Sequence, residues 1–207
     1  MNAPYIGQSI KRKEDQRFLT GGGTYTDDVS AVNQTHAYFL RSPHAHANIR
    51  SIRLDQARAA PGVVGIFTGA DLAAAKVGTL PCGWLITDVN GQPMKEPPHP
   101  CLAQGKVRHV GDQVAVVIAE TLNQAKDAAA LIEVDYDVLP AVVNAADARK
   151  PGAAVLHDGV PDNTSYVWAL GAKDAVDKAF ATAKHVDRKS TRLNSSHTDI
   201  SRMPSSA

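Results

Sequence analysis

Residues 113–138 carry the pattern that most constrains the fold. QVAVVIA (113–119) is a continuous apolar run, typical of a strand that is buried on both faces. Thr121 is placed to cap a following helix, and EVDYDV (133–138) has the composition of a second strand. The apolar stripe of that helix comprises Leu122, Ala125, Ala129 and Ile132. The segment predicts a strand–helix–strand unit, with a right-handed crossover if the two strands pair in parallel.

Further strands are predicted before this unit. THAYFLR (35–41) and NIRSIRL (48–54) have strand composition and flank SPHAHA, which favours a hairpin or a bent ribbon. VVGIF (63–67) is typical of a buried strand, and Thr68 can cap a short helix after it. We expect seven aliphatic residues to form the densest core: Val114, Val116, Val117, Ile118, Leu122, Ile132 and Val134.

Two stretches are rich in residues that interrupt regular structure. Residues 78–105 contain five prolines and four glycines, which predicts a long loop of the kind that usually carries function or covers a partner surface. Residues 150–163 form a second Pro/Gly/Asp-rich connector. Beyond it, SYVWAL (165–170) predicts a strand and KDAVDKAFATAK (173–184) predicts a helix. A second domain is expected to begin there.

Composition excludes several classes of protein. The 207 residues suit one large domain or two modest ones, and 22 Lys+Arg against 21 Asp+Glu disfavours a nucleic-acid binder. The longest apolar run has six residues, and the N-terminus lacks a signal-peptide core, so we expect no membrane span and a cytoplasmic location. Cys82 and Cys101 form no CxxC motif and are expected to be ordinary reduced thiols.

The last 21 residues break with the rest of the chain. Residues 187–207 hold six serines, no aromatic residue and no sustained period, which predicts a disordered tail. DRKSTRLNSSH (187–197) also resembles, codon by codon, the translation of a common sequencing adapter, and SRMPSSA (201–207) resembles the adapter's distal part. We therefore expect a non-native tail from Asp187 onward and exclude it from functional argument.

Candidate chemical groups are scattered. His44 and His46 would share one face if their segment were a strand, a geometry compatible with metal binding, but two hydrogen-bonding histidines in a turn are the favoured interpretation. Gly21-Gly22-Gly23 lacks the GxGxxG pattern and favours a tight turn over a phosphate cradle. Cys82 and Cys101 with His99 give only weak evidence for a metal or thiol site.

Acidic residues form short groups instead of a catalytic constellation. Asp135 and Asp137 share one side of a predicted strand, and this spacing is typical of a solvated sheet edge. The other groups are Glu14-Asp15 and Asp27-Asp28. From the residues alone, the chain is an α/β module without a visible active site, so no catalytic, cofactor-binding or metal-binding residue is assigned.

Four long segments resemble a known enzyme family, in order and over most of residues 5–186. They are IGQSIKRKEDQRFLTGGGTYTDDV (6–29), FLRSPHAHANIRSIRLDQARAAPGVVGIFTGADL (39–72), VGDQVAVVIAETLNQAKDAAALIEVDYDVLPAVV (110–143) and WALGAKDAVDKAFATAKHV (168–186). The chain is similar to the start of the molybdopterin-binding large subunit of xanthine dehydrogenase-type molybdenum hydroxylases. Aldehyde oxidase and the aerobic carbon monoxide dehydrogenase large subunit belong to the same group.

The resemblance implies an α+β fold. Residues 1–150 would form the family's α/β hammerhead domain, and 151–186 would hold a connector plus the first strand and helix of the molybdenum-cofactor-binding domain. The intact family enzymes hydroxylate a carbon centre with oxygen from water, or oxidise carbon monoxide. They use molybdenum held by molybdopterin, as a dinucleotide, with 2Fe-2S clusters and FAD on partner subunits or domains. The segments that contact the cofactor lie beyond residue 186, so this chain is expected to bind none and to be inactive by itself.

An alternative is a free-standing, non-catalytic scaffold or binding module. An independent domain should end in a completed element, whereas one strand–helix pair of a new domain is begun here before the adapter-like tail. This edge favours the N-terminal part of an oxidoreductase subunit. The sequence does not identify the substrate, and xanthine, aldehydes, N-heterocycles and carbon monoxide all stay open.

Overall fold

The structure is a computed structural model that describes residues 7 and 9–188 of the chain. Most of the expected tail, residues 189–207, lies outside the described residues, so its disorder stays a prediction. The strands are β1 (His36–Arg41), β2 (Ala47–Arg53), β3 (Val63–Thr68), β4 (Lys106–Val107), β5 (Gln113–Ala119) and β6 (Glu133–Val138). The helices are α1 (Asp15–Leu19), η1 (Thr26–Asp28), α2 (Asp55–Arg58), α3 (Gly69–Ala74), α4 (Leu122–Ala130), η2 (Ala145–Asp147) and α5 (Lys173–Thr182).

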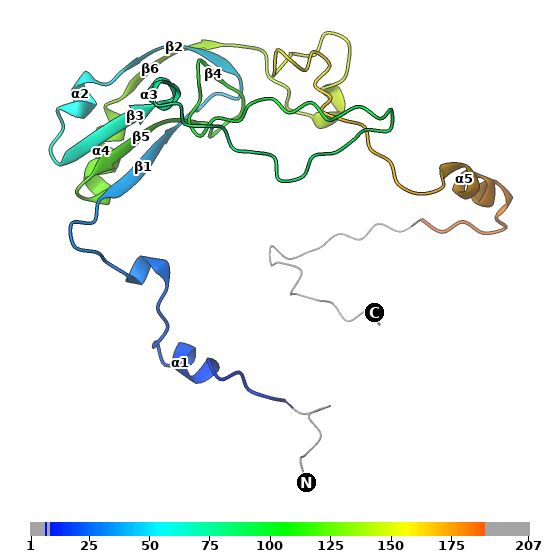
Figure 1. Ribbon diagram of the computed structural model, residues 1–207, viewed down its shortest axis with the longest axis horizontal. Helices are drawn as coiled ribbons and strands as arrows, with labels where there is room; N and C mark the ends of the chain where they lie inside the picture. The colour runs from blue at the N-terminus through cyan, green and yellow to red at the C-terminus, as the bar shows by residue number, and fades with distance from the viewer. Residues whose placement is uncertain (1–6, 8, 189–207) are drawn as a thin grey trace.

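Within the described residues, the strands form two three-stranded antiparallel sheets (Figure 1). In the first sheet β5 lies between β1 and β3, and in the second β2 lies between β4 and β6. Helix α4 packs on the first sheet and against α2. The segment before β1 and helix α5 both extend away from the two sheets (Figure 1).

The strand–helix–strand unit forms in sequence but not as a parallel crossover. β5, α4 and β6 occupy the predicted residues, yet β6 joins the second sheet by pairing with β2. Both edges of β5 are already occupied by the antiparallel strands β1 and β3. A parallel partner has therefore no free edge of β5 to join, and the question of crossover handedness does not arise.

Of the two arrangements expected for residues 35–54, a hairpin or a bent ribbon, the hairpin is wrong. β1 and β2 do not pair with each other, because the chain passes from the first sheet to the second at residues 42–46. Two backbone hydrogen bonds hold this bend: the Ser42 amide donates to the Asp112 carbonyl (2.8 Å) and the Gly111 amide donates to the Ser42 carbonyl (2.8 Å). The turn before β5 thus fixes the point at which the chain changes sheets.

The core partly matches the expectation. The main cluster lies between β5 and α4, and a second cluster comprises Ala47, Ala103, Val107 and Val114. The main cluster comprises Leu54, Ala57, Ile66, Ala115, Val117, Ala119, Ala125, Ala128, Ala129 and Ile132, with Val134 packed against it. Small alanine side chains let α4 approach the sheet closely.

Three residues of the expected core lie elsewhere. Leu122 is 41% exposed at the start of α4, and Val116 and Ile118 are only half-buried. Successive side chains of a strand point to opposite faces, so Val116 and Ile118 lie across the sheet from the face that α4 covers. β3 is an edge strand with a register shift between Val63 and Gly65. Ile66 is buried in the core, but Val64 and Phe67 are exposed, so the expectation of a buried strand there is wrong.

The predicted caps form at both helices. The Thr121 hydroxyl accepts a hydrogen bond from the Gln124 amide (3.2 Å) at the start of α4. At α3, the amide and the hydroxyl of Thr68 both donate to the Asp71 carboxylate (2.7 Å each). These bonds lower the pKa of Asp71, the hydroxyl bond contributing most. Each cap satisfies polar groups that the first helical turn leaves without an intrahelical partner.

The C-terminal region differs from the expectation in one element. Helix α5 forms, but residues 165–170 are not a strand. Their backbone makes two hydrogen bonds to the long loop, from the amides of Val89 and Lys95 to the carbonyls of Val167 and Ser165 (2.9 Å each). Two isolated bonds do not make a ladder. Among the residues that the structure describes, no helix is long and apolar enough to cross a membrane.

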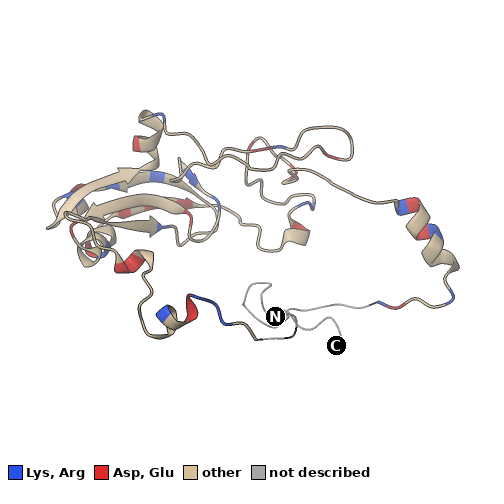
Figure 2. Ribbon diagram, turned by 60° about the horizontal axis from the view of Figure 1, so that its bottom comes forward, with Lys and Arg blue, Asp and Glu red and all other residues tan. Residues whose placement is uncertain are grey.

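Charges are interspersed along the chain. Residues of both signs are mixed over the sheets and along α5, while a short basic run precedes α1 (Figure 2). Exposed ion pairs join Arg53 to Glu133 across β2 and β6, and Lys173 to Asp177 within α5. Such surface pairs contribute little to stability, on the order of 0–1 kcal/mol each.

Candidate functional site

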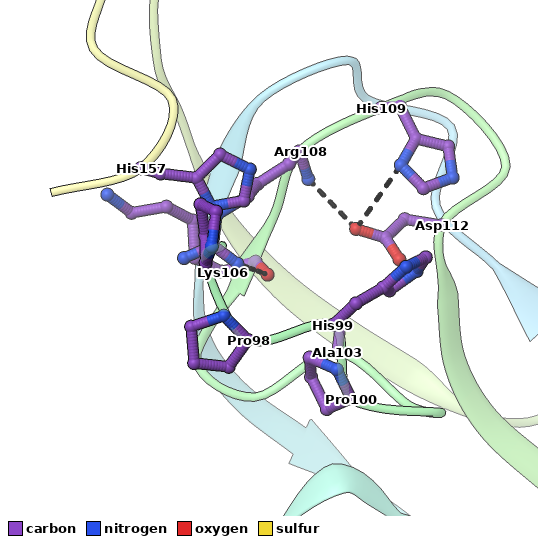
Figure 3. A pocket seen from close by; sticks show the side chains of 10 residues that line it. Pro98, His99, Pro100, Ala103, Lys106, Arg108, His109, Asp112 and His157 are labelled. Carbon is purple, nitrogen blue, oxygen red and sulfur yellow. Dashed lines mark hydrogen bonds and ion pairs between the residues drawn. The ribbon is translucent and has the colours of Figure 1, made fainter. Parts of the chain in front are cut away.

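A groove lies between residues 95–112, which run from the end of the long loop to the turn before β5, and residues 157–160 of the connector. Its inner cavity has a volume of about 240 Å³. An adjoining cavity of about 410 Å³ shares Pro97, Pro98, Pro100, Arg108 and His157 with it. The inner cavity is lined by Pro97, Pro98, His99, Pro100, Ala103, Lys106, Arg108, His109, Asp112 and His157 (Figure 3). We call this feature the basic groove.

Both sheets anchor the basic groove. Strand β4, which begins with Lys106, pairs with β2 of the second sheet. The turn that carries His109 and Asp112 leads directly into β5 of the first sheet, and the Ala103 amide donates to the Gln113 carbonyl (2.7 Å). Gly111 adopts a positive φ of 87° in this turn, a conformation that glycine reaches without steric cost.

Asp112 organises one wall of the basic groove. Its carboxylate accepts a hydrogen bond from the Arg108 backbone amide (2.9 Å) and lies 3.7 Å from Nδ1 of His109. The Asp112 side chain is only 17% exposed. A carboxylate held in this way fixes the turn between β4 and β5 and pairs with the imidazole of His109 when that ring is protonated.

Lys106 and Arg108 supply the permanent positive charge. Nζ of Lys106 lies 3.5 Å from Asp158, which is 87% exposed, while the Lys106 side chain itself is 20% exposed. Nε of Arg108 donates to the Leu156 carbonyl (2.9 Å), and Nη1 lies 3.5 Å from the Lys106 carbonyl. Figure 3 shows both basic side chains beside His157 and across the cavity from Asp112.

The pKa of His157 reports the electrostatic character of the groove. Burial is the largest cause that lowers this pKa, and the positive charge of Arg108 is the next. Asp158 acts in the opposite direction, whereas His99 and Lys106 lower the pKa of His157 further. Burial is therefore the main reason why protonation of this imidazole is disfavoured, and the nearby cations add to it.

The two histidines singled out from the sequence lie in the bend between β1 and β2, not on a strand. His46 is 3% exposed, and its Nδ1 lies 2.7 Å from the Pro140 carbonyl. Its Nε2 is buried and has no hydrogen-bond partner within the part of the chain that the structure describes. His44 packs edge-on against Tyr136, with the ring centroids 4.9 Å apart. The two imidazoles are thus held by different partners, as expected for histidines in a structured turn.

Neither the glycine candidates nor the cysteine candidates form a site. The Gly22 amide donates to the Arg17 carbonyl (2.7 Å) and Gly21 has a φ of 76°, so the glycines end α1 in a tight turn. Cys82 is exposed, Cys101 is partly buried, and both are free thiols. His99 lines the basic groove and the two cysteines do not.

The acidic candidates are surface or structural groups. Asp137 forms an ion pair with Arg50 (3.0 Å), and Asp135 is exposed on the same strand. Asp28 accepts from the Tyr25 amide (2.9 Å) and Asp15 accepts from the Arg12 amide (3.2 Å). Within residues 7 and 9–188, no three His, Cys, Asp or Glu side chains are grouped so that they could hold a metal ion.

Sequence reasoning missed the basic groove. Arg108, His109, Asp112 and His157 come from two segments that are separated by about 45 residues of chain, and no local motif links them. The available signal was the long Pro/Gly-rich loop itself, since such loops often carry function. The sequence thus indicated where a site could lie, and of the residues that line it only His99 was singled out, for a metal or thiol site.

Comparison with known proteins identifies the fold. Residues 20–140 match the family model described as "Aldehyde oxidase and xanthine dehydrogenase, a/b hammerhead domain". The carbon monoxide dehydrogenase large chain of Afipia carboxidovorans is 35% identical over 195 residues, covering 88% of this chain and 23% of that protein. The nicotine 6-hydroxylase large subunit of Paenarthrobacter nicotinovorans is 36% identical over 183 residues, covering 87% of this chain and 21% of that protein.

A solved structure has the same architecture. Reconstituted CO dehydrogenase from Oligotropha carboxidovorans superposes with a TM-score of 0.72 at 34% identity, covering 86% of this chain and 22% of that one. The chain therefore spans about a fifth of the length of the relatives it matches. It belongs to the aldehyde oxidase and xanthine dehydrogenase family, and its two-sheet body is the α/β hammerhead domain of that family.

Proposed function

We propose that the chain is the N-terminal part of the molybdopterin-binding large subunit of a molybdenum hydroxylase. The observation that carries the proposal is the continuous 35% identity over 195 residues to a carbon monoxide dehydrogenase large chain. The complete enzyme would hydroxylate a carbon centre with oxygen from water, or oxidise carbon monoxide. Within it, the hammerhead domain would act as a structural module and not as the site of the reaction.

The division of the chain follows from this proposal. Residues 1–150 would form the hammerhead domain, 151–186 would hold the connector and the first helix of the cofactor-binding domain, and 187–207 would be non-native. The exposed apolar face of α5 supports the second part. Val176 and Phe180 lie one helical turn apart and are 50% and 59% exposed. Such a stripe is typical of a helix that packs on further protein.

Cofactors and partners belong to the same proposal. The complete subunit would hold molybdenum through molybdopterin as a dinucleotide, and electrons would leave through 2Fe-2S clusters to FAD on partner subunits of a cytoplasmic complex. We propose no ligand of molybdenum in this chain, because the resemblance places the segments that contact the cofactor beyond residue 186.

Sequencing the source DNA downstream of the codon for Val186, followed by expression of the extended subunit with its iron–sulfur and FAD partners, tests the proposal. We expect stoichiometric molybdenum by elemental analysis and substrate-dependent dye reduction. The substrate panel would be carbon monoxide, nicotine, quinoline, hypoxanthine, xanthine and an aldehyde. A natural stop codon just after Val186, or stoichiometric molybdenum in the 207-residue chain itself, would contradict it and favour a free-standing module.

A further inference from the structure

We infer that the basic groove binds a small oxoanion of the phosphate class. The inference goes beyond the proposed function, because it concerns a ligand held between the hammerhead domain and the connector and not the redox centre. It rests on the side chains that face the cavity, on their existing hydrogen bonds and on the shape of the cavity wall.

Lys106 places a poorly compensated ammonium at the cavity. Four-fifths of its side chain is buried, and among the described residues its one ion-pair partner is Asp158 at 3.5 Å. Asp158 is 87% exposed, so water screens its charge. Partial burial removes solvation from an ammonium, and a second acceptor would restore it. An oxoanion in the cavity provides such acceptors.

Arg108 has donors left to give. Nε is engaged by the Leu156 carbonyl at 2.9 Å, and Nη1 makes only a long contact of 3.5 Å with the Lys106 carbonyl. No further side-chain hydrogen bond of this guanidinium involves the described part of the chain. A guanidinium carries five N–H donors in a planar fork that matches the oxygens of phosphate and carboxylate groups. The Leu156 contact fixes the orientation of that fork.

Asp112 does not neutralise the two cations. Its carboxylate accepts from the Arg108 backbone amide at 2.9 Å and lies near His109, on the other wall of the cavity (Figure 3). The protonation of His157 is disfavoured by burial and by Arg108, so this ring adds an uncharged donor at neutral pH. The inner cavity is thus bordered by two cations and by one carboxylate that is already hydrogen-bonded, while the carboxylate of Asp158 lines the adjoining cavity as the exposed partner of Lys106.

The wall of the cavity is preformed. Pro97, Pro98 and Pro100 lie along it, and proline rings fix the backbone φ angle, so little conformational entropy remains to be lost on binding. The inner cavity of about 240 Å³ is smaller than the roughly 300–1,000 Å³ of pockets for drug-sized ligands. This size suits an anion of a few heavy atoms.

Calorimetric titration of the 207-residue chain with inorganic phosphate at constant ionic strength tests the inference. We expect saturable binding of one phosphate per chain in the millimolar range or tighter, with chloride giving no such isotherm. Lys106→Met should weaken binding at least about tenfold, since it removes a charge-assisted hydrogen bond. Lys126→Met is the matched control, because Lys126 is exposed on α4 outside the groove, and should leave binding unchanged.

A second measurement follows the imidazole of His157 by NMR. Phosphate bound beside this ring should raise the pKa of His157, and Lys106→Arg should retain both this response and the binding. Equal heats with phosphate and chloride, or unaltered binding by Lys106→Met, would overturn the inference. Binding of acetate without binding of phosphate would overturn it too and indicate a protein carboxylate as the occupant. If Lys106→Met does not fold, the unaltered chain still provides a test. The same pKa of His157 with and without phosphate would then overturn the inference.

Discussion

Gly69 lies directly against the backbone carbonyl of Ala103. A Cβ atom placed on Gly69 would lie 2.2 Å from the Ala103 oxygen and 2.8 Å from its carbonyl carbon. Gly69 is the buried first residue of α3, and Ala103 belongs to the wall of the basic groove. The absence of a side chain at Gly69 therefore lets the start of α3 support the loop that shapes the groove.

Gly69→Ala should destabilise the chain, because the new methyl group meets backbone that cannot move as a flexible side chain can. We expect a loss of about 1–3 kcal/mol in the free energy of unfolding, the range found for overpacked sites. Urea denaturation followed by circular dichroism measures it. Gly78→Ala is the control, since a Cβ there would have no atom of the described residues within 4 Å apart from its chain neighbours. Equal midpoints for the two variants would contradict this account of the contact.

Val117→Ala should be among the costly core truncations. Val117 is a fully buried residue of β5 that packs in the main core cluster beside α4. Its neighbours are mostly small alanines, which cannot move in to fill the cavity that the truncation would leave. A loss of about 2–3 kcal/mol is expected from burial and cavity terms. Leu122→Ala removes a larger side chain that is 41% exposed, and should cost less. If the two truncations have the reverse order in denaturant unfolding, the position of the core is wrong.

Local patterns were enough to predict most elements, while pairings between distant residues were not. The apolar run of β5 and the caps at Thr68 and Thr121 depend on neighbours in sequence, and the structure confirms them. The hairpin was wrong because the bend at Ser42 depends on the Asp112 carbonyl, 70 residues later. A one-dimensional pattern does not contain that contact.

The basic groove could not be predicted from the sequence for the same reason. Arg108 is oriented by the Leu156 carbonyl, and nothing in the sequence around either residue indicates that pairing. The family could be recognised nonetheless, because long collinear strings carry that information without any contact being known. Residues 165–170 show the limit of composition, since their apolar side chains do not form a strand without a neighbouring ladder.

His44 and His46 should not hold zinc tightly. Nδ1 of His46 is used by the Pro140 carbonyl and Nε2 is buried, so coordination would require the bend to open. Two imidazoles would also leave zinc short of its usual four ligands. Equilibrium dialysis of the chain against zinc should give no submicromolar affinity. Tight binding that disappears in His46→Ala would reverse this interpretation.

His157 should make stability depend on pH. Burial, and then the charge of Arg108, lower its pKa below the ordinary value of 6.5, so the folded state binds a proton less readily than the unfolded state does. The contribution of the neutral ring to stability is therefore complete above that value and is lost as the pH falls through the lowered folded-state pKa.

Thermal unfolding of the unaltered chain should show a larger drop in midpoint between about pH 7.5 and about pH 5.5 than His157→Gln does. His185→Gln changes an exposed histidine and should behave as the unaltered chain. The account fails if all three proteins lose the same number of degrees, because the groove would then impose no penalty on the protonated ring.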